Sequence, residues 1–236
     1  MIGFPAEVTV ELGIFFIIAI VVIAIVVLIV FFNQDARVKR ALRRVPLVRI
    51  VDFSDGAEAR LVGKVLLLEE FCAPLSGRPC AHYHLEIEHR RSSGKSSHWV
   101  TIIDDAKTVD FIVDDGSGRA IVETGQSQFA VVRDANARSG TFKDATPELE
   151  KLLQQYGESS SGLLGFNKTL RYREGVIEAE EMVAVFGKGQ WIKDSGGKRQ
   201  LVISKPAETM VLISDDPSTT KQGMSSLETI HNGKGR

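Results

Sequence analysis

An uncharged apolar run near the start of the chain constrains the fold more than any other feature. Gly13 to Phe32 reads GIFFIIAIVVIAIVVLIVFF, twenty residues without a charge or a proline. As a helix rising about 1.5 Å per residue, the run covers roughly 30 Å, the thickness of the hydrocarbon core of a bilayer. A helix also pairs its own backbone groups in lipid, which a single strand cannot do. The run predicts a transmembrane helix at residues 13–32, preceded by a short N-terminal segment at residues 1–12.

The residues around this run favour a retained anchor and predict its orientation. Glu7 and Glu11 precede it, whereas a cleaved signal peptide starts with basic residues and ends in a small-residue cleavage site. Lys and Arg are absent from the first 36 residues, and the run is then followed by five basic residues: Arg37, Lys39, Arg40, Arg43 and Arg44. By the positive-inside rule this end faces the cytoplasm. We therefore expect a single-pass membrane protein with its N-terminus outside and its C-terminal domain in the cytoplasm.

The basic segment at residues 33–46 has helical spacing. Its arginines recur at i, i+3 and i+7, and its apolar side chains form another side: Val38, Leu42 and Val45. Each basic residue beside anionic headgroups gains about 1 kcal/mol, so we expect the five basic residues at a membrane surface, with the lipid bilayer as a partner. The need to orient the membrane span is sufficient to explain these charges, and specific lipid binding is the alternative interpretation.

From residue 47 onward, short apolar runs alternate with turn residues, which is typical of strands. At Ala81–Glu88 apolar and polar residues alternate, which predicts a strand with one buried and one wet face. Asp114–Gly118 predicts a hairpin turn, and Thr146–Glu148 predicts a helix start. A further strand is predicted at Leu47–Val51. The sequence thus predicts a β-dominated α+β domain over residues 47–215 and a disordered tail over residues 216–236.

Composition and motifs exclude several classes of function. The formal net charge is -1, and the few aromatic residues are not interleaved with basic ones, so no nucleic-acid partner is expected. Cys72 and Cys80 cannot form a disulfide framework; they form either one bridge or two ordinary thiols. The sequence contains no phosphate loop, nucleophile elbow or zincin motif. No catalytic residue and no cofactor are predicted.

Three residues with metal-binding side chains fall at alternate positions: Cys80, His82 and His84. In a regular strand they project from one face, and thiolate and imidazole suit zinc or copper. Neighbours on one strand face lie about 6–7 Å apart, however, which is too far for all three to reach one ion comfortably. They are weak candidates for a metal site, and plain surface histidines are the favoured interpretation.

One motif gives a resemblance to a known family. The run FCAPLSGRPC at Phe71–Cys80, with shorter matches at Asp110–Asp115, Tyr172–Gly175 and Val183–Gly187, resembles the GIDE-type domain of the mitochondrial ubiquitin ligase family that includes MULAN. This domain is also called the "beside a membrane" domain, and the resemblance covers about residues 48–213. It implies a role beside a membrane and an association with E3 ubiquitin ligases. Stand-alone versions of the domain occur in prokaryotes.

The chain departs from that family in two ways. Family ligases add a second membrane span and a C-terminal RING, whose two tetrahedral zinc ions need eight Cys or His ligands, whereas this chain has 2 Cys and 5 His. Ubiquitin ligation by this chain alone is therefore excluded, and a RING from another chain would be required. In the family the domain faces the intermembrane space, whereas the charges here predict the cytoplasm.

The proline-glycine loop of the motif is the predicted recognition surface. Rigid exposed loops often carry binding, so the candidate binding residues are Pro74, Leu75, Ser76, Gly77, Arg78 and Pro79. The alternative is a structural turn that positions Cys80. We predict a membrane-anchored, non-enzymatic interaction module whose partner is a membrane or membrane-proximal protein. The alternative is an enzyme, either a metal-assisted hydrolase or a component resembling an E3 ubiquitin ligase.

Overall fold

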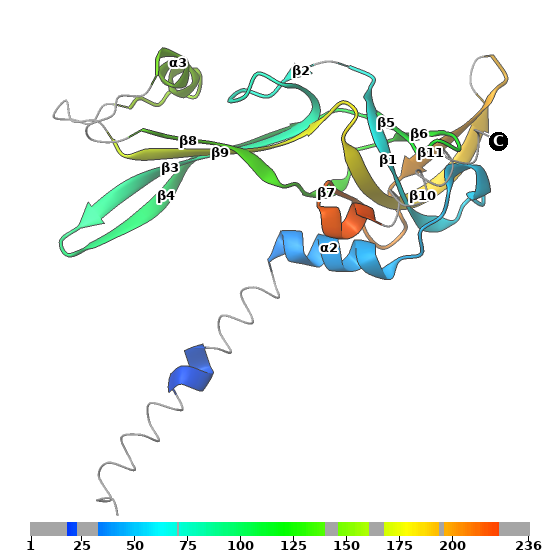
Figure 1. Cartoon of the computed structure of the whole chain (residues 1–236), viewed down its shortest axis with the longest axis horizontal. Helices are drawn as coiled ribbons and strands as arrows, with labels where there is room; N and C mark the ends of the chain where they lie inside the picture. Colours follow the sequence, from blue (N-terminus) through cyan, green and yellow to red (C-terminus); the bar gives the residue numbers. More distant parts are fainter. Residues whose placement is uncertain are drawn as a thin grey trace, which may run out of the picture.

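Two β-sheets lie end to end and give the protein an elongated shape (Figure 1). The computed structural model describes residues 18–22, 33–69, 71–139, 146–160, 168–193 and 196–221. The elements are α2 (Gln34–Arg44), the 3-10 turn η1 (Ile50–Asp52), β1 (Glu58–Leu67), β2 (Phe71–Cys72), β3 (Pro79–Ser93), β4 (Ser96–Thr108), β5 (Phe111–Asp114), β6 (Arg119–Val122), β7 (Ser127–Ala130), β8 (Arg133–Ser139), α3 (Pro147–Gln155), β9 (Leu170–Glu178), β10 (Met182–Lys193), β11 (Arg199–Ser204) and β12 (Val211–Ser214).

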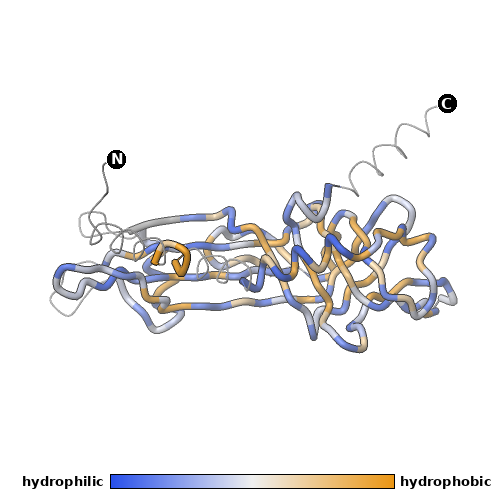
Figure 2. The backbone as a smooth tube through the Cα atoms, turned by 90° about the horizontal axis from the view of Figure 1, so that it is seen from below, coloured by the Kyte–Doolittle hydropathy of each residue, from blue (hydrophilic) through white to orange (hydrophobic). Residues whose placement is uncertain are grey.

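Five strands of the first sheet close into a small barrel. β1 pairs with β5, β5 with β6, β6 with β11, β11 with β10, and β10 with β1 again. Only the β6–β11 pair of this ring is parallel. β12 and β7 continue the sheet outward from β10. Hydrophobic stretches gather at this end of the molecule (Figure 2), because each strand turns apolar side chains into one core: Leu61, Val65, Phe111, Val113, Ala120, Val122, Val183, Val185, Leu201 and Ile203.

The segment before β1 packs into this core as a 3-10 turn. Ile50 and Phe53 are buried there, and two glycines make room for them. A Cβ atom at Gly189 would lie 2.2 Å from Cε1 of Phe53, and one at Gly118 would lie 2.8 Å from Cγ2 of Ile50. The predicted strand at Leu47–Val51 is therefore wrong, and only one isolated bridge, at Leu47, joins it to β1. Ile50 and Val48 pack into the barrel core, Leu47 packs on the outer face of the sheet, and Val51 is exposed.

The second sheet has β3 at its centre, with β9 and β8 on one side and β2 and β4 on the other. Helix α3 covers one face and begins where the sequence predicts, with Thr146 accepting a hydrogen bond from the N–H of Leu149 at 3.4 Å. The hydroxyl groups of Tyr83 and Tyr156 both donate to Oδ2 of Asp105, at 2.8 and 2.5 Å, and tie the helix end to the sheet. The opposite face is polar, but it is not the wet face that the alternation in β3 predicts, because His82 and Glu88 on it are buried.

Helix α2 confirms the helical spacing of the basic segment, but its apolar side packs on the protein itself. Val38 and Leu42 are buried against the outer face of the barrel sheet, together with Val62, Ala184, Phe186 and Leu212. Lys39 Nζ lies 2.6 Å from Oδ2 of Asp216, which fixes the helix to the chain after β12. The apolar side of this helix is thus covered by the barrel sheet.

The predicted membrane span requires correction. Among the residues that the structure describes, no helix is long and apolar enough to cross a membrane. A span needs about 20 continuous apolar helical residues. Of the predicted span, only residues 18–22 are described, as helix; residues 13–17 and 23–32 lie outside the described residues, as do residues 1–12. The fold class is corrected to a β-dominated α+β domain of two sheets, and the predictions of a single-pass membrane protein, its localisation and its sidedness are withdrawn.

The predicted disordered tail is also wrong at its start. Residues 217–221 form a helical turn beside α2, and Thr219 and Thr220 within it are buried. The carbonyl oxygen of Thr219 accepts a hydrogen bond from Nη1 of the buried Arg60 at 3.4 Å. The rest of the predicted tail, residues 222–236, lies outside the described residues.

Two carboxyl groups where the sheets meet predict a dependence of stability on pH. Burial raises the pKa of Glu181 to about 7 and that of Asp215 to about 6. Because both pKa values are higher in the folded chain, the folded protein binds more protons, and the free energy of unfolding falls as the pH rises from about 4 to about 7.

Glu181→Gln keeps an acceptor for the N–H of Glu178. We expect this variant to gain stability over the wild type at about pH 8 and to lose the gain at about pH 5, measured by urea denaturation. A stability difference that is the same at both pH values would contradict the prediction.

Candidate functional site

The predicted recognition loop is fixed by a buried carboxylate beneath it. Glu174 of β9 is fully buried, and its two oxygens accept hydrogen bonds from the N–H groups of Leu75 and Ser76, at 2.8 and 3.0 Å. Gly77 adopts a φ of +69° and donates its N–H to the carbonyl oxygen of Ala73 at 2.8 Å. These contacts favour the structural interpretation for the middle of the loop.

Arg78 of this loop is engaged as well. Its guanidinium donates to both carboxylate oxygens of Asp134, at 2.7 and 2.9 Å, and this hydrogen bonding holds the pKa of Asp134 below its usual range. Pro74 and Leu75 are half-buried, which leaves Ser76, Gly77 and Pro79 as the exposed part of the six predicted residues. A partner would meet a small polar tip there, with little apolar surface and no available charge.

A β-bulge separates Cys80 from the two histidines. β3 pairs Cys80 and His82 with successive residues of β9, so Ala81 is an extra residue in the ladder. A bulge reverses the alternation of faces. Cys80 therefore packs in the core under α3, while His82 and His84 lie on the opposite face. The common face predicted for the three is wrong, and among the described residues no three His, Cys, Asp or Glu side chains gather to hold a metal ion.

The two histidines line a cavity of about 450 Å³ between the sheets. His82 stacks on Phe129 with the ring centroids 3.8 Å apart, and its Nδ1 lies 2.6 Å from Oγ1 of Thr108. Burial, with a smaller contribution from His84, lowers the pKa of His82 to about 3, so this imidazole is neutral. Nε2 of His84 lies 2.6 Å from Oδ1 of Asp104. Both rings are engaged by neighbours in the sheets, which makes them poor candidates for a ligand site.

The cysteines are free and lie on opposite faces of a strand pair. β2 and β3 place Phe71 opposite Cys80 and Cys72 opposite Pro79, so the two sulfur atoms point to different sides. Cys72 is exposed, whereas Cys80 is buried and donates to the carbonyl oxygen of Phe71 at 3.7 Å. Of the alternatives left open by the sequence, the structure favours two thiols over one bridge.

The different burial of the thiols predicts a two-stage labelling experiment. Burial raises the pKa of the Cys80 thiol to about 11, so the reactive thiolate is scarce at neutral pH. We expect a chromogenic disulfide reagent to react with Cys72 at once in the native protein, and with Cys80 after denaturation. Cys72→Ser should abolish the fast phase, and Cys80→Ser should abolish the slow one. If both thiols reacted equally fast in the native protein, the difference in burial would be wrong. If neither reacted until the protein was reduced, the two cysteines would form a disulfide.

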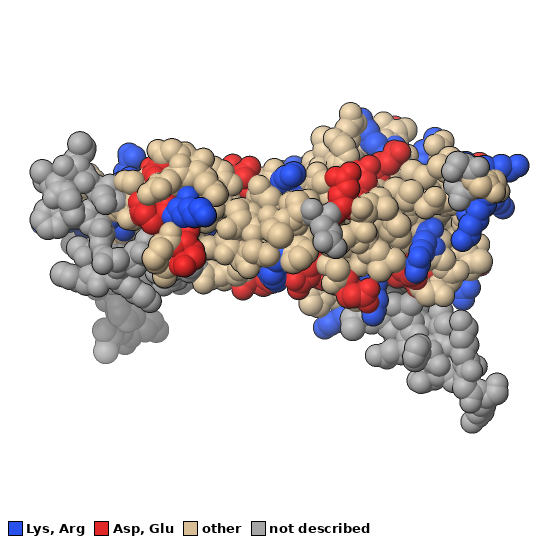
Figure 3. Space-filling view, turned by 90° about the horizontal axis from the view of Figure 1, so that it is seen from above, with Lys and Arg blue, Asp and Glu red and all other residues tan. Residues whose placement is uncertain are grey.

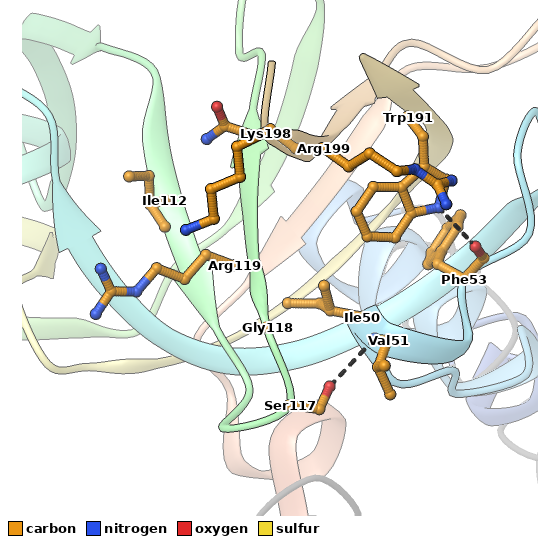
Figure 4. A pocket seen from close by; sticks show the side chains of 11 residues that line it. Ile50, Val51, Phe53, Ile112, Ser117, Gly118, Arg119, Trp191, Lys198 and Arg199 are labelled. Atoms are coloured by element: carbon orange, nitrogen blue, oxygen red, sulfur yellow. Dashed lines mark hydrogen bonds between the residues drawn. The ribbon is translucent and has the colours of Figure 1, made fainter. Parts of the chain in front are cut away.

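A cleft of about 740 Å³ at the barrel, here called the barrel cleft, combines apolar and basic side chains (Figure 4). Its apolar part consists of Ile50, Val51, Ile112 and Trp191, and its basic part of Arg119, Lys198 and Arg199. Val51 is 54% exposed although it is aliphatic. On the face drawn in Figure 3, basic side chains gather at the barrel end of the molecule. An apolar hollow with a cationic rim is the arrangement that fits an amphipathic anion.

The parallel pairing of β6 and β11 brings the basic side chains together. Arg119 is the first residue of β6 and Arg199 the first of β11, and parallel strands begin at the same edge of a sheet. The guanidinium of Arg199 lies over the ring of Trp191, 4.8 Å from its centroid. The indole is itself fixed, because its Nε1 donates to the carbonyl oxygen of Phe53 at 2.8 Å. In Figure 4, Lys198 extends over the hollow toward the Arg119 side.

Two aspartates beside the cleft are occupied by the chain itself. Asp115 is buried and accepts four hydrogen bonds, from the N–H groups of Ile50, Ser117 and Gly118 and the hydroxyl of Ser117, at 2.7 to 3.0 Å. Asp114 accepts from the N–H of Gly116 and from Nε of Arg119, each at 2.9 Å. These contacts fix the β5–β6 turn and position Arg119. The cleft is therefore preorganised before any ligand arrives.

The barrel cleft is not among the sites predicted from the sequence. The adjacent basic pair Lys198-Arg199 and the tryptophan a few residues before it were the available signals. Neither signal is specific, because an adjacent basic pair is also typical of a solvated turn. What makes the site is the pairing of β6 with β11, which the sequence does not reveal.

Comparisons with known proteins match neither a family model, nor a curated protein, nor a solved structure. The resemblance to the GIDE-type domain accordingly stays a prediction from motifs.

Proposed function

We propose that this protein is a non-enzymatic interaction module that holds an anionic part of a partner in the barrel cleft. The observation that carries the proposal is the cationic rim: Arg119, Lys198 and Arg199 line one hollow with a fixed indole. Asp114 already engages Nε of Arg119 at 2.9 Å, so an anion of the partner would add to the contacts of Arg119 and meet the positive charges of Lys198 and Arg199 beside it. The apolar part of the cleft adds the area burial that makes such contacts stable.

The chemistry of the other candidate residues supports binding over catalysis. Among the residues proposed for a metal-assisted hydrolase, Cys80 is a poor nucleophile, because it is buried and its pKa is raised to about 11. A general base needs a pKa near the working pH, whereas His82 has a pKa of about 3. A ligase-like role would require a RING from another chain, and none of the contacts described above favours it.

Charge reversal at the rim tests the proposal. The variant Lys198→Glu/Arg199→Glu reverses two charges of the cleft, and Arg91→Glu/Lys95→Glu makes the same charge change near the tip of the β3–β4 hairpin, at the other end of the molecule. Binding partners should be recovered by the wild type and the hairpin variant, and lost or weakened at least about tenfold with the cleft variant. Equal recovery by all three proteins, or no specific partner for any of them, would refute the proposal. Thermal melting of each variant checks that the fold is retained.

A further inference from the structure

We infer that the anionic partner is a polypeptide segment in which carboxylate side chains flank one bulky apolar side chain. This inference rests on the proposed function and gives the partner a chemical description. Three properties of the barrel cleft lead to it: its exposed apolar part, the way its backbone N–H groups are used, and the spread of its cationic rim.

The apolar part of the cleft is unusually open to solvent. Val51 is more than half exposed, and Ile112 and Trp191 are half-buried, although each has a largely apolar side chain. Trp191 is held at its nitrogen edge by Phe53, so its ring cannot turn away from solvent. Covering such a surface removes apolar area from water, which favours binding. A bulky aliphatic or aromatic side chain of the partner provides that cover.

The use of the backbone N–H groups favours carboxylate over phosphate. Phosphate sites are typically built from several N–H groups of a glycine-rich turn or a helix start. The β5–β6 turn is glycine-rich, but Asp114 and Asp115 already accept the N–H groups of Gly116, Ser117 and Gly118. Recognition is left to guanidinium and ammonium groups, which suit carboxylates as salt-bridge partners.

The spread of the rim favours an extended segment over a single small anion. In Figure 4, Arg119 points away on one side, Lys198 lies over the middle, and Arg199 reaches across to Trp191. Two or more carboxylates separated by an apolar anchor match this arrangement, as they occur along a peptide. The closed ring of the barrel leaves no strand edge at β6 and β11, so side chains provide the recognition.

Selection from a random peptide library tests this composition while the natural partner is unidentified. Phage-displayed peptides of about twelve residues are selected on the full chain, on Lys198→Glu/Arg199→Glu and on the hairpin control Arg91→Glu/Lys95→Glu. The wild type and the control should enrich Asp and Glu around Phe, Trp, Leu or Ile, and the cleft variant should lose this enrichment. Selected peptides that lack acidic residues, or enrichment that survives charge reversal in the cleft, would overturn the inference.

A fluorescence titration then measures the contacts directly. The chain has 2 tryptophans, so Trp99→Phe leaves Trp191 as the reporter inside the cleft. A selected peptide should shift the emission of Trp191, and its Asp→Asn, Glu→Gln version should bind at least about tenfold more weakly. ADP and inorganic pyrophosphate serve as phosphate probes. If they bind and acidic peptides do not, the peptide inference is wrong while the proposed anion binding stands; if neither class binds, both are wrong.

Discussion

Gly63→Ala should lower the free energy of unfolding by about 2–4 kcal/mol, because it places an atom where the barrel has no space. Gly63 lies in β1, and a Cβ atom built on it would be 2.5 Å from the carbonyl oxygen of Asp114 and 2.7 Å from its carbonyl carbon. Both are backbone atoms of β5, the strand that pairs with β1. A side chain could rotate away from the methyl group, but a paired strand must separate. Urea denaturation followed by circular dichroism measures the loss.

Gly125→Ala is the matched control for this substitution. Nothing lies within 4 Å of a Cβ atom built on Gly125, so the same added methyl group should change the stability by no more than about 0.5 kcal/mol. If both variants were equally stable, the close approach of β1 to β5 would not limit the fold. Gly63→Ala should also weaken ligand binding in the cleft, since Asp114 holds Arg119 by a hydrogen bond of 2.9 Å.

Glu174→Leu should lower the free energy of unfolding by about 3–5 kcal/mol. The carboxylate of Glu174 is fully buried and satisfies the N–H groups of Leu75 and Ser76. Removing it leaves both donors without this acceptor and breaks the loop away from β9, and a donor that stays buried without a partner costs about 1–3 kcal/mol. Glu174→Gln should have an intermediate effect, because one of its two terminal atoms is a donor and cannot accept an N–H. Chemical denaturation of the three proteins gives the order.

Hydrogen exchange shows where this loss occurs. In Glu174→Gln the amides of Leu75 and Ser76 should exchange faster, whereas the amides of the barrel strands should keep their protection. Ser76→Ala serves as the control, because its exposed hydroxyl only accepts a bond from Nε of Arg78 at 3.2 Å and its removal should cost little. Unchanged exchange in the loop of Glu174→Gln would show that the loop is fixed by something else.

Local patterns in the sequence predict local structure well. The helix at α3 follows from Thr146 and Pro147, and the β5–β6 hairpin follows from its acidic and glycine-rich turn, because each depends on neighbouring residues. The seven polar and small residues of β8 carry no strand pattern, and they form a strand because β9 offers them a partner. Ala81 carries no sign of the bulge that moves Cys80 to the other face.

The candidate site depends on pairings that no local pattern contains. Arg119 and Arg199 meet because β6 and β11 run in parallel within a closed ring, and Ile50 and Phe53 lie beneath them because Gly118 and Gly189 lack side chains. The apolar run at residues 13–32 is the opposite case: a strong local pattern predicts a membrane span, while among the described residues no helix meets the requirement.

The four hydrogen bonds accepted by Asp115 make one part of the cleft, η1 and the β5–β6 turn, less tolerant of substitution than the rest. The Asp115 side chain joins η1 to the β5–β6 turn, so a substitution of Asp115 would disturb both segments. Lys198 lies just before β11 and Arg199 begins it, and both are exposed. Replacing them leaves the four contacts of Asp115 intact, and replacing Arg199 removes its contact with the ring of Trp191. Affinity reagents for differently charged peptides could therefore be engineered by exchanging the residues at these two positions on an otherwise constant scaffold.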